Sequence, residues 1–78
     1  RQVLLADARG EVAYYEVDWG LPSALIIGGE AEGASEEAKR LAHRKVYIPM
    51  PGGAESLNAA VAASIMLFEA ARQQTNLF

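Results

Sequence analysis

The chain contains no cysteine, one histidine and one tryptophan among its 78 residues. Without cysteine it can form no disulfide bond, no thiolate metal site and no thiol nucleophile. A single histidine leaves too few ligands for a transition-metal site, so we expect no metal ion. Because disulfides belong to oxidising compartments, their exclusion fits a cytoplasmic protein, and we expect that location.

Long apolar runs are also missing. The longest, residues 59–68, contains Ser64 and is shorter than the roughly 20 residues that cross a bilayer, so we expect no membrane association. The chain begins with arginine and shows no signal-peptide pattern, and 78 residues are few for a domain. We therefore expect an excised part of a larger domain. Its net charge is −3, whereas modules that hold RNA by themselves are usually basic.

Short apolar segments do occur, and they are predicted to form strands. Residues 3–6, 24–27 and 45–48 each have the length and composition of a buried strand. Residues 24–27 are continuously apolar, which is typical of a central parallel strand covered on both faces. Residues 12–17 alternate imperfectly, and we interpret them as an extended connection.

A first helix is predicted to begin after Ser35, which can cap it. Glutamates follow at its start and cations lie toward its end near His43, an order that suits the helix dipole. Its inner face is expected to contain Ala38, Leu41 and Ala42. His43 is interpreted as a surface residue near the helix end.

A second helix is predicted from a cap at Ser56 to about Gln74, with a solvated end at residues 72–74. Its expected apolar stripe consists of Leu57, Val61, Ile65 and Phe68. Alanines and further apolar residues fill most of the other sides, so we expect missing residues or a second subunit to cover this helix.

Strand, loop and helix repeated in this order indicate an α/β fold, a parallel sheet with flanking helices. Ligands of such sheets bind beyond the carboxyl ends of the strands, which places the loops at residues 28–35 and 49–58 on one rim. Taken alone, the first loop is most simply a tight turn. It lacks the Walker lysine and the glycine spacing of dinucleotide-binding loops.

Taken together, the two loops resemble a known family. Residues 25–33, Leu-Ile-Ile-Gly-Gly-Glu-Ala-Glu-Gly, are similar to the second signature motif of SpoU/TrmH-type RNA 2′-O-methyltransferases, although many members have asparagine at position 29 and glycine at position 31. Residues 48–58, from Ile-Pro-Met to Glu-Ser-Leu-Asn, are similar to the third motif. The resemblance spans residues 4–73. The family's first motif, with its catalytic arginine and asparagine, has no counterpart here.

This resemblance implies that residues 1–78 are the C-terminal part of a SPOUT domain, whose trefoil knot holds S-adenosylmethionine. The matching cofactor positions are Gly28, Ile48, Met50 and Leu57, and the matching polar catalytic positions are Glu30, Ser56 and Asn58. The polar residues would position the target ribose.

The implied activity is methyl transfer to a ribose 2′-hydroxyl of tRNA or rRNA by a homodimer with the last helix at its interface. Because the first motif is absent, we expect the isolated chain to be inactive. Two alternatives stay open: a non-catalytic module that positions RNA or a partner, and a small-molecule-binding domain unrelated to RNA. Trp19, Tyr14 and Tyr15 could stack on bases, although packing is their more common role.

Overall fold

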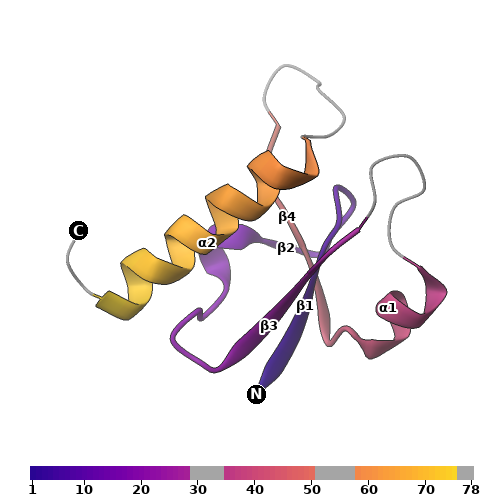
Figure 1. Ribbon diagram of the computed structural model, residues 1–78, viewed down its shortest axis with the longest axis horizontal. Coiled ribbons are helices and arrows are strands. Elements are labelled where there is room, and N and C mark those ends of the chain that lie inside the picture. The colour runs from indigo at the N-terminus through magenta and orange to yellow at the C-terminus, as the bar shows by residue number, and fades with distance from the viewer. Residues whose placement is uncertain (29–34, 51–57, 76–78) are drawn as a thin grey trace.

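The computed structural model describes residues 1–28, 35–50 and 58–75 of the chain (Figure 1). In order, the elements are β1 (Gln2–Ala6), β2 (Val12–Ala13), a 3₁₀ turn η1 (Tyr14–Glu16), β3 (Ser23–Ile27), α1 (Glu36–Leu41), β4 (Arg44–Tyr47) and α2 (Ala59–Thr75). The three strands expected from apolar segments are all present, with boundaries shifted by one residue.

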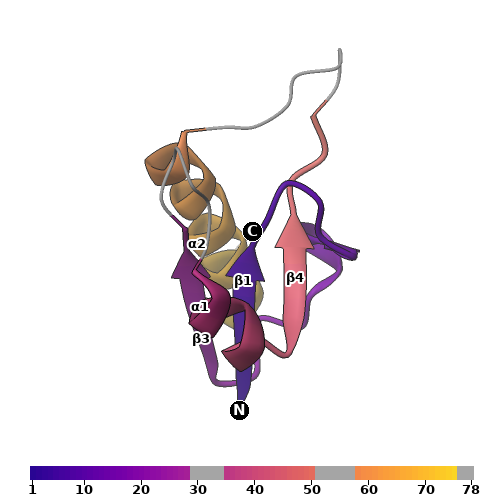
Figure 2. The same ribbon diagram turned by 90° about the vertical axis from the view of Figure 1, so that its right-hand side faces the viewer.

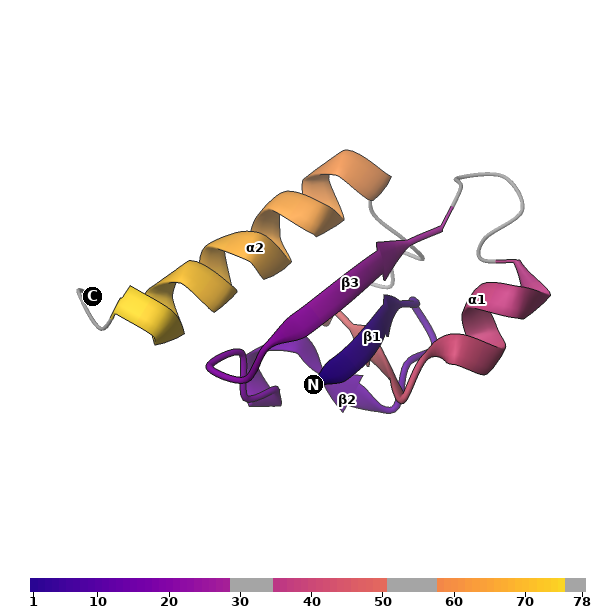
Figure 3. The ribbon, with the colours of Figure 1, turned by 60° about the horizontal axis from the view of Figure 1, so that its bottom comes forward.

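The strands form one parallel sheet in the order β2-β4-β1-β3. The helices lie on opposite faces of it, with α1 in front of the sheet and α2 behind it in Figure 2. Helix α2 runs alongside β3 (Figure 3). The predicted α/β class with a parallel sheet and flanking helices is confirmed.

Strand β3 is an edge strand among the described residues, so its predicted central position is wrong. It pairs only with β1 in the described sheet, from Gln2 opposite Ser23 to Ala6 opposite Ile27. The inner position belongs to β1, whose Leu4 and Leu5 are fully buried. A continuous apolar run indicates that a strand needs cover, but it does not determine which strands lie beside it.

Residues 12–17 are not a simple extended connection, as the sequence suggested. Val12 and Ala13 form a short strand opposite Val46 and Tyr47 of β4, and the chain then turns through η1. The preceding loop approaches β4 closely: a Cβ built on Gly10 would lie 2.7 Å from the carbonyl oxygen of Lys45. A glycine is therefore needed at position 10 for steric reasons.

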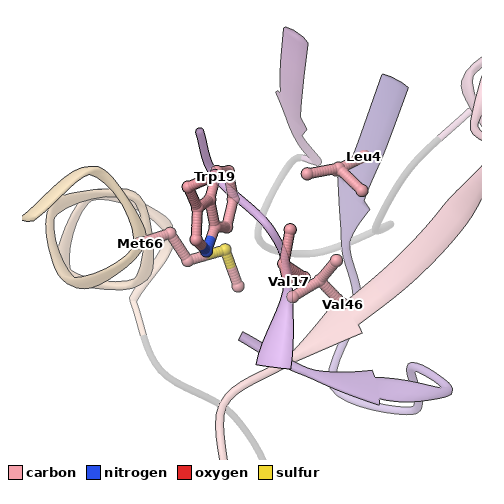
Figure 4. Close-up of a cluster of buried hydrophobic side chains, with 5 residues drawn as sticks. All are labelled: Leu4, Val17, Trp19, Val46 and Met66. Carbon is pink, nitrogen blue, oxygen red and sulfur yellow. The ribbon is translucent and has the colours of Figure 1, made fainter. Parts of the chain in front are cut away.

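The hydrophobic core lies between the sheet and α2. Its buried cluster consists of Leu4, Val17, Trp19, Val46 and Met66 (Figure 4). Trp19 is 2% exposed, and its indole Nε1 donates a hydrogen bond of 2.8 Å to the carbonyl oxygen of Tyr14. Packing, rather than base stacking, is therefore the role of this tryptophan in the structure.

Helix α2 presents a different face to the core from the one predicted. Met66 and Glu69 are its buried residues, whereas Val61 and Phe68 of the predicted stripe are 47% and 61% exposed. A helix that is apolar nearly all round has no strong periodicity, so its sequence pattern does not fix its rotation.

Polar contacts near the end of α2 accompany this orientation of the helix about its own axis. Gln73 accepts a hydrogen bond from the backbone N–H of Trp19 at 2.8 Å and donates to the carbonyl oxygen of Val17 at 3.0 Å and to Glu69 at 2.8 Å. Gln74 donates to the carbonyl oxygen of Trp19 at 2.8 Å. We call Glu69, Gln73 and Gln74 the C-terminal clamp. Residues 72–74 do lie at the helix end, with Arg72 and Gln74 exposed as predicted, but Gln73 and Gln74 also bond the backbone of Val17 and Trp19.

Glu69 is a nearly buried carboxylate, and Arg72 compensates its charge. Arg72 donates from Nε and from Nη2 to the two carboxylate oxygens, at 2.9 and 2.6 Å. These bonds, together with that from Gln73, lower the pKa of Glu69 to about 2 against the desolvation that opposes them. The same pair raises the pKa of Arg72.

Helix α1 begins as predicted and ends earlier than predicted. The hydroxyl of Ser35 accepts a hydrogen bond of 3.1 Å from the backbone N–H of Ala38, which confirms the cap. The helix stops at Leu41, which is 59% exposed and so does not belong to the inner face. The chain then turns at His43, whose N–H donates to the carbonyl oxygen of Val3 at 2.8 Å.

Candidate functional site

The carboxyl ends of three strands meet at one edge of the sheet. Gly28 directly follows β3 and Ile48 directly follows β4, and both strands pair in parallel with β1, which lies between them. The two strands therefore end on either side of β1, at the edge drawn uppermost in Figure 2. The predicted common rim is confirmed for the described ends of the two loops.

This rim offers apolar side chains and backbone groups. Ile48 is half-buried and packs against the core cluster, which anchors the first residue after β4. Gly28 and Met50 are also half-buried. Such surroundings suit a flat, uncharged ring held by backbone hydrogen bonds. The adenosine part of S-adenosylmethionine has this chemistry, so the described residues fit that cofactor.

Asp7 also lies at this rim, although no motif in the sequence selects it as a site residue. It follows β1, and its N–H donates to the carbonyl oxygen of Val46 at 2.9 Å. Its Oδ1 accepts from the N–H of Arg9 at 2.9 Å, as in a turn. Its position between Gly28 and Ile48 follows from the strand order, which a single sequence does not reveal.

Asn58 has a defined place at the start of α2. Its Oδ1 accepts from the N–H of Ala60 at 2.8 Å and from that of Val61 at 3.4 Å. In the described residues Asn58 therefore caps the helix, the role that we predicted for Ser56. These bonds fix the side chain at the end of α2 that follows the loop after β4.

Three of the predicted site residues, Glu30, Ser56 and Leu57, lie outside the described residues. Of the four that are described, Gly28 and Ile48 lie at the rim, Met50 follows Ile48 by two residues, and Asn58 directly precedes α2. Within residues 1–28, 35–50 and 58–75, no group of three or more His, Cys, Asp or Glu side chains is arranged to bind a metal ion. No helix in the same ranges is long and apolar enough to span a membrane.

Comparison with known proteins identifies this arrangement. The sequence model of the SpoU rRNA Methylase family matches residues 1–68, most of the chain. The chain belongs to this family. Among other family relatives, it is 48% identical over 71 residues to a tRNA (guanosine(18)-2′-O)-methyltransferase of Thermus thermophilus, with 91% of this chain and 35% of that protein covered. It is also 48% identical over 68 residues to the mitochondrial rRNA methyltransferase 3 of Mus musculus, with 81% of this chain and 16% of that protein covered.

Solved structures from the same family have the same fold. The SpoU methyltransferase AviRb of Streptomyces viridochromogenes, in complex with the cofactor AdoMet, superposes with a TM-score of 0.90 at 39% identity, covering 96% of this chain and 30% of that one. The TrmH/SpoU tRNA modifying enzyme of A. aeolicus gives a TM-score of 0.85 at 39% identity, covering 96% and 39%. The chain therefore spans between about a sixth and two fifths of these SpoU relatives.

Proposed function

We propose that residues 1–78 are the cofactor-binding C-terminal part of an S-adenosylmethionine-dependent RNA ribose 2′-O-methyltransferase that acts on tRNA or rRNA. One observation carries the proposal: a chain of the SpoU family brings Gly28 and Ile48 to a common rim on either side of β1. A relative with this fold has been solved with AdoMet.

The proposed cofactor contacts are Gly28, Ile48, Met50 and Leu57. Gly28 offers backbone groups without a side chain in the way, and Ile48 offers an apolar surface anchored by the core. When bound, S-adenosylmethionine supplies a methyl group carried on a positively charged sulfur. We assign the positioning of the target ribose to Glu30, Ser56 and Asn58, the last of which is held by its bonds at the start of α2.

We also infer that the complete protein is a cytoplasmic homodimer with a trefoil knot. The dimer has support in the structure, because α2 presents Val61, Leu67 and Phe68 at 47%, 59% and 61% exposure. An apolar helix face of this kind is usually covered by other protein. The knot rests on the family resemblance alone, and the location rests on the absence of cysteine from residues 1–78.

Calorimetric titration with S-adenosylmethionine tests the cofactor site. We expect the unchanged chain to bind it, and Gly28→Leu to weaken binding at least tenfold, about 1.4 kcal/mol, because the added side chain occupies the rim. Leu41→Ser is the matched control, since Leu41 is exposed on α1 and α1 precedes the start of β4 rather than its end.

Equal affinities for the unchanged chain and Gly28→Leu would contradict the assignment of Gly28. No binding by a chain whose circular dichroism shows that it is folded would instead favour the non-catalytic module. Weakening by Leu41→Ser to the same extent would show that the loss reflects the fold and not the rim.

The isolated chain is expected to transfer no methyl group. The family's first motif is absent from residues 1–78, so no residue of this chain matches its catalytic arginine. The measurement is transfer of labelled methyl from S-adenosylmethionine to an unmodified tRNA transcript, with the Thermus thermophilus relative as the positive control. Labelled RNA in the reaction with this chain alone would disprove the assignment of catalysis to the upstream motif.

A further inference from the structure

The cations of this acidic chain are distributed unevenly. Its net charge is −3, yet Lys39, Arg40, Arg44 and Lys45 lie within seven residues that contain no aspartate or glutamate. This segment forms the end of α1, the turn at His43 and the start of β4. We call it the basic turn.

Two of the four cations have acidic neighbours. Lys39 pairs with Glu36 at 3.7 Å. The backbone N–H of Glu11 donates to the carbonyl oxygen of Lys45, so an acidic residue is the neighbour of Lys45 on the adjacent chain segment.

Arg40 and Arg44 are exposed, and no described carboxylate lies within ion-pair distance of either. Glu37 is the nearest acid along the helix, one turn before Arg40, and makes no ion pair with it among the described residues. The helix dipole accounts for a cation at Arg40, but α1 ends at Leu41 and Arg44 already belongs to β4. Neither local pairing nor helix stability explains both arginines.

The basic turn is held firmly to the sheet. The N–H of His43 donates to the carbonyl oxygen of Val3 at 2.8 Å, and the N–H of Val3 donates to Nδ1 of His43 at 2.9 Å. His43 thus continues the hydrogen bonding between β1 and β4 with its own side chain. Because the backbone of the turn is fixed at this point, binding would need to order only the flanking arginine side chains.

The basic turn lies at the edge where the strands begin, opposite the rim where they end (Figure 1). Between the two edges β4 has four residues, roughly 13 Å of extended chain. A folded RNA is larger than this, so an RNA whose target ribose lies at the rim can also reach the basic turn.

We propose that the basic turn binds the phosphodiester backbone of the RNA, with Arg40 and Arg44 as the phosphate-binding side chains. Guanidinium groups match phosphate oxygens in geometry as well as charge. The contact positions the RNA and carries no sequence information. The inference rests on the proposed function, which makes RNA the substrate.

The test compares the chain with two double variants, Arg40→Gln with Arg44→Gln, and Arg40→Lys with Arg44→Lys. Binding of a labelled tRNA transcript is followed by fluorescence anisotropy over a series of salt concentrations. Each lost phosphate contact reduces the slope of log Kobs against log salt by about 0.7 to 0.9. We therefore expect the glutamine variant to lose about 1.4 to 1.8 from the slope, and the lysine variant to keep it.

The proposal is overturned if the unchanged chain shows no salt-dependent binding of the transcript, or if the glutamine variant keeps the full slope. Stronger binding to anionic vesicles than to the transcript also overturns it. Circular dichroism verifies that each variant is folded. Titration with S-adenosylmethionine separates this proposal from the proposed function. Both variants should bind the cofactor with the affinity of the unchanged chain. If the chain binds RNA through these arginines but does not bind the cofactor, only the proposed function is refuted.

Discussion

Replacing Trp19 with alanine is expected to unfold most of the chain at room temperature. The indole is 2% exposed and packs with Met66 and Val17 between the sheet and α2 (Figure 4). Truncation of a buried tryptophan costs about 3–5 kcal/mol, and a chain of this size has little more than that in total. It also removes the donor to the carbonyl oxygen of Tyr14. Urea unfolding followed by circular dichroism measures the loss.

Two variants separate packing from hydrogen bonding in this prediction. Trp19→Phe keeps an aromatic ring but removes the Nε1 donor, so we expect an intermediate loss of about 1–3 kcal/mol. Tyr15→Ala is the matched control, because Tyr15 is 55% exposed and makes only an edge contact with the ring of Tyr14 among the described aromatic pairs. If Trp19→Ala costs no more than Tyr15→Ala, the core is not organised around Trp19.

The fold class could be predicted because it depends on local patterns. Apolar segments such as residues 24–27 predict strands, and Ser35 followed by two glutamates predicts a helix start. The position of β3 could not be predicted, because strand order depends on contacts between segments far apart in the chain. Packing was the favoured role for Trp19, but the sequence context does not identify Met66 and Val17 as its partners.

The face of α2 that is buried could not be predicted from the sequence either. Its alanine-rich sequence offers several possible buried faces, and the polar residues decide among them. Glu69 and Gln73 are ordinary surface residues by composition. They face inward because Val17 and Trp19 provide backbone groups that Gln73 can bond. Long-range bonds of this kind leave no signal in one sequence.

The candidate site could be predicted because the two loop motifs together match one family. Either loop alone is also explained as a turn or a helix cap with no role in binding. Their common rim follows from parallel strands and was predictable on that ground. The capping role of Asn58 was not, because Ser56 satisfies the same sequence rule two residues earlier. Asp7 at the rim and Asn58 at the start of α2 also show that a polar side chain can serve the backbone.

The second large effect expected is loss of stability in acid through Glu69. The pKa of Glu69 is about 2 in the fold, below its ordinary 4.5, so the unfolded chain binds the proton more readily. Its contribution is complete above pH 4.5 and is lost as the pH falls from 4.5 toward 2. We expect a contribution on the order of 2 kcal/mol, reduced by solvent around the half-exposed Arg72.

Glu69→Gln isolates this contribution because it keeps the shape of the side chain and removes its charge. Urea unfolding followed by Trp19 fluorescence, at neutral pH and in steps from pH 4.5 to 2, should show the variant less stable at neutral pH and the two proteins converging in acid. Glu36→Gln is the control: the side chain of Glu36 is 88% exposed in its pair with Lys39, and its loss should change little. Parallel curves for the chain and Glu69→Gln would mean that the bonds from Arg72 and Gln73 hold the residue in place without favouring its charge, and that the C-terminal clamp acts through geometry alone.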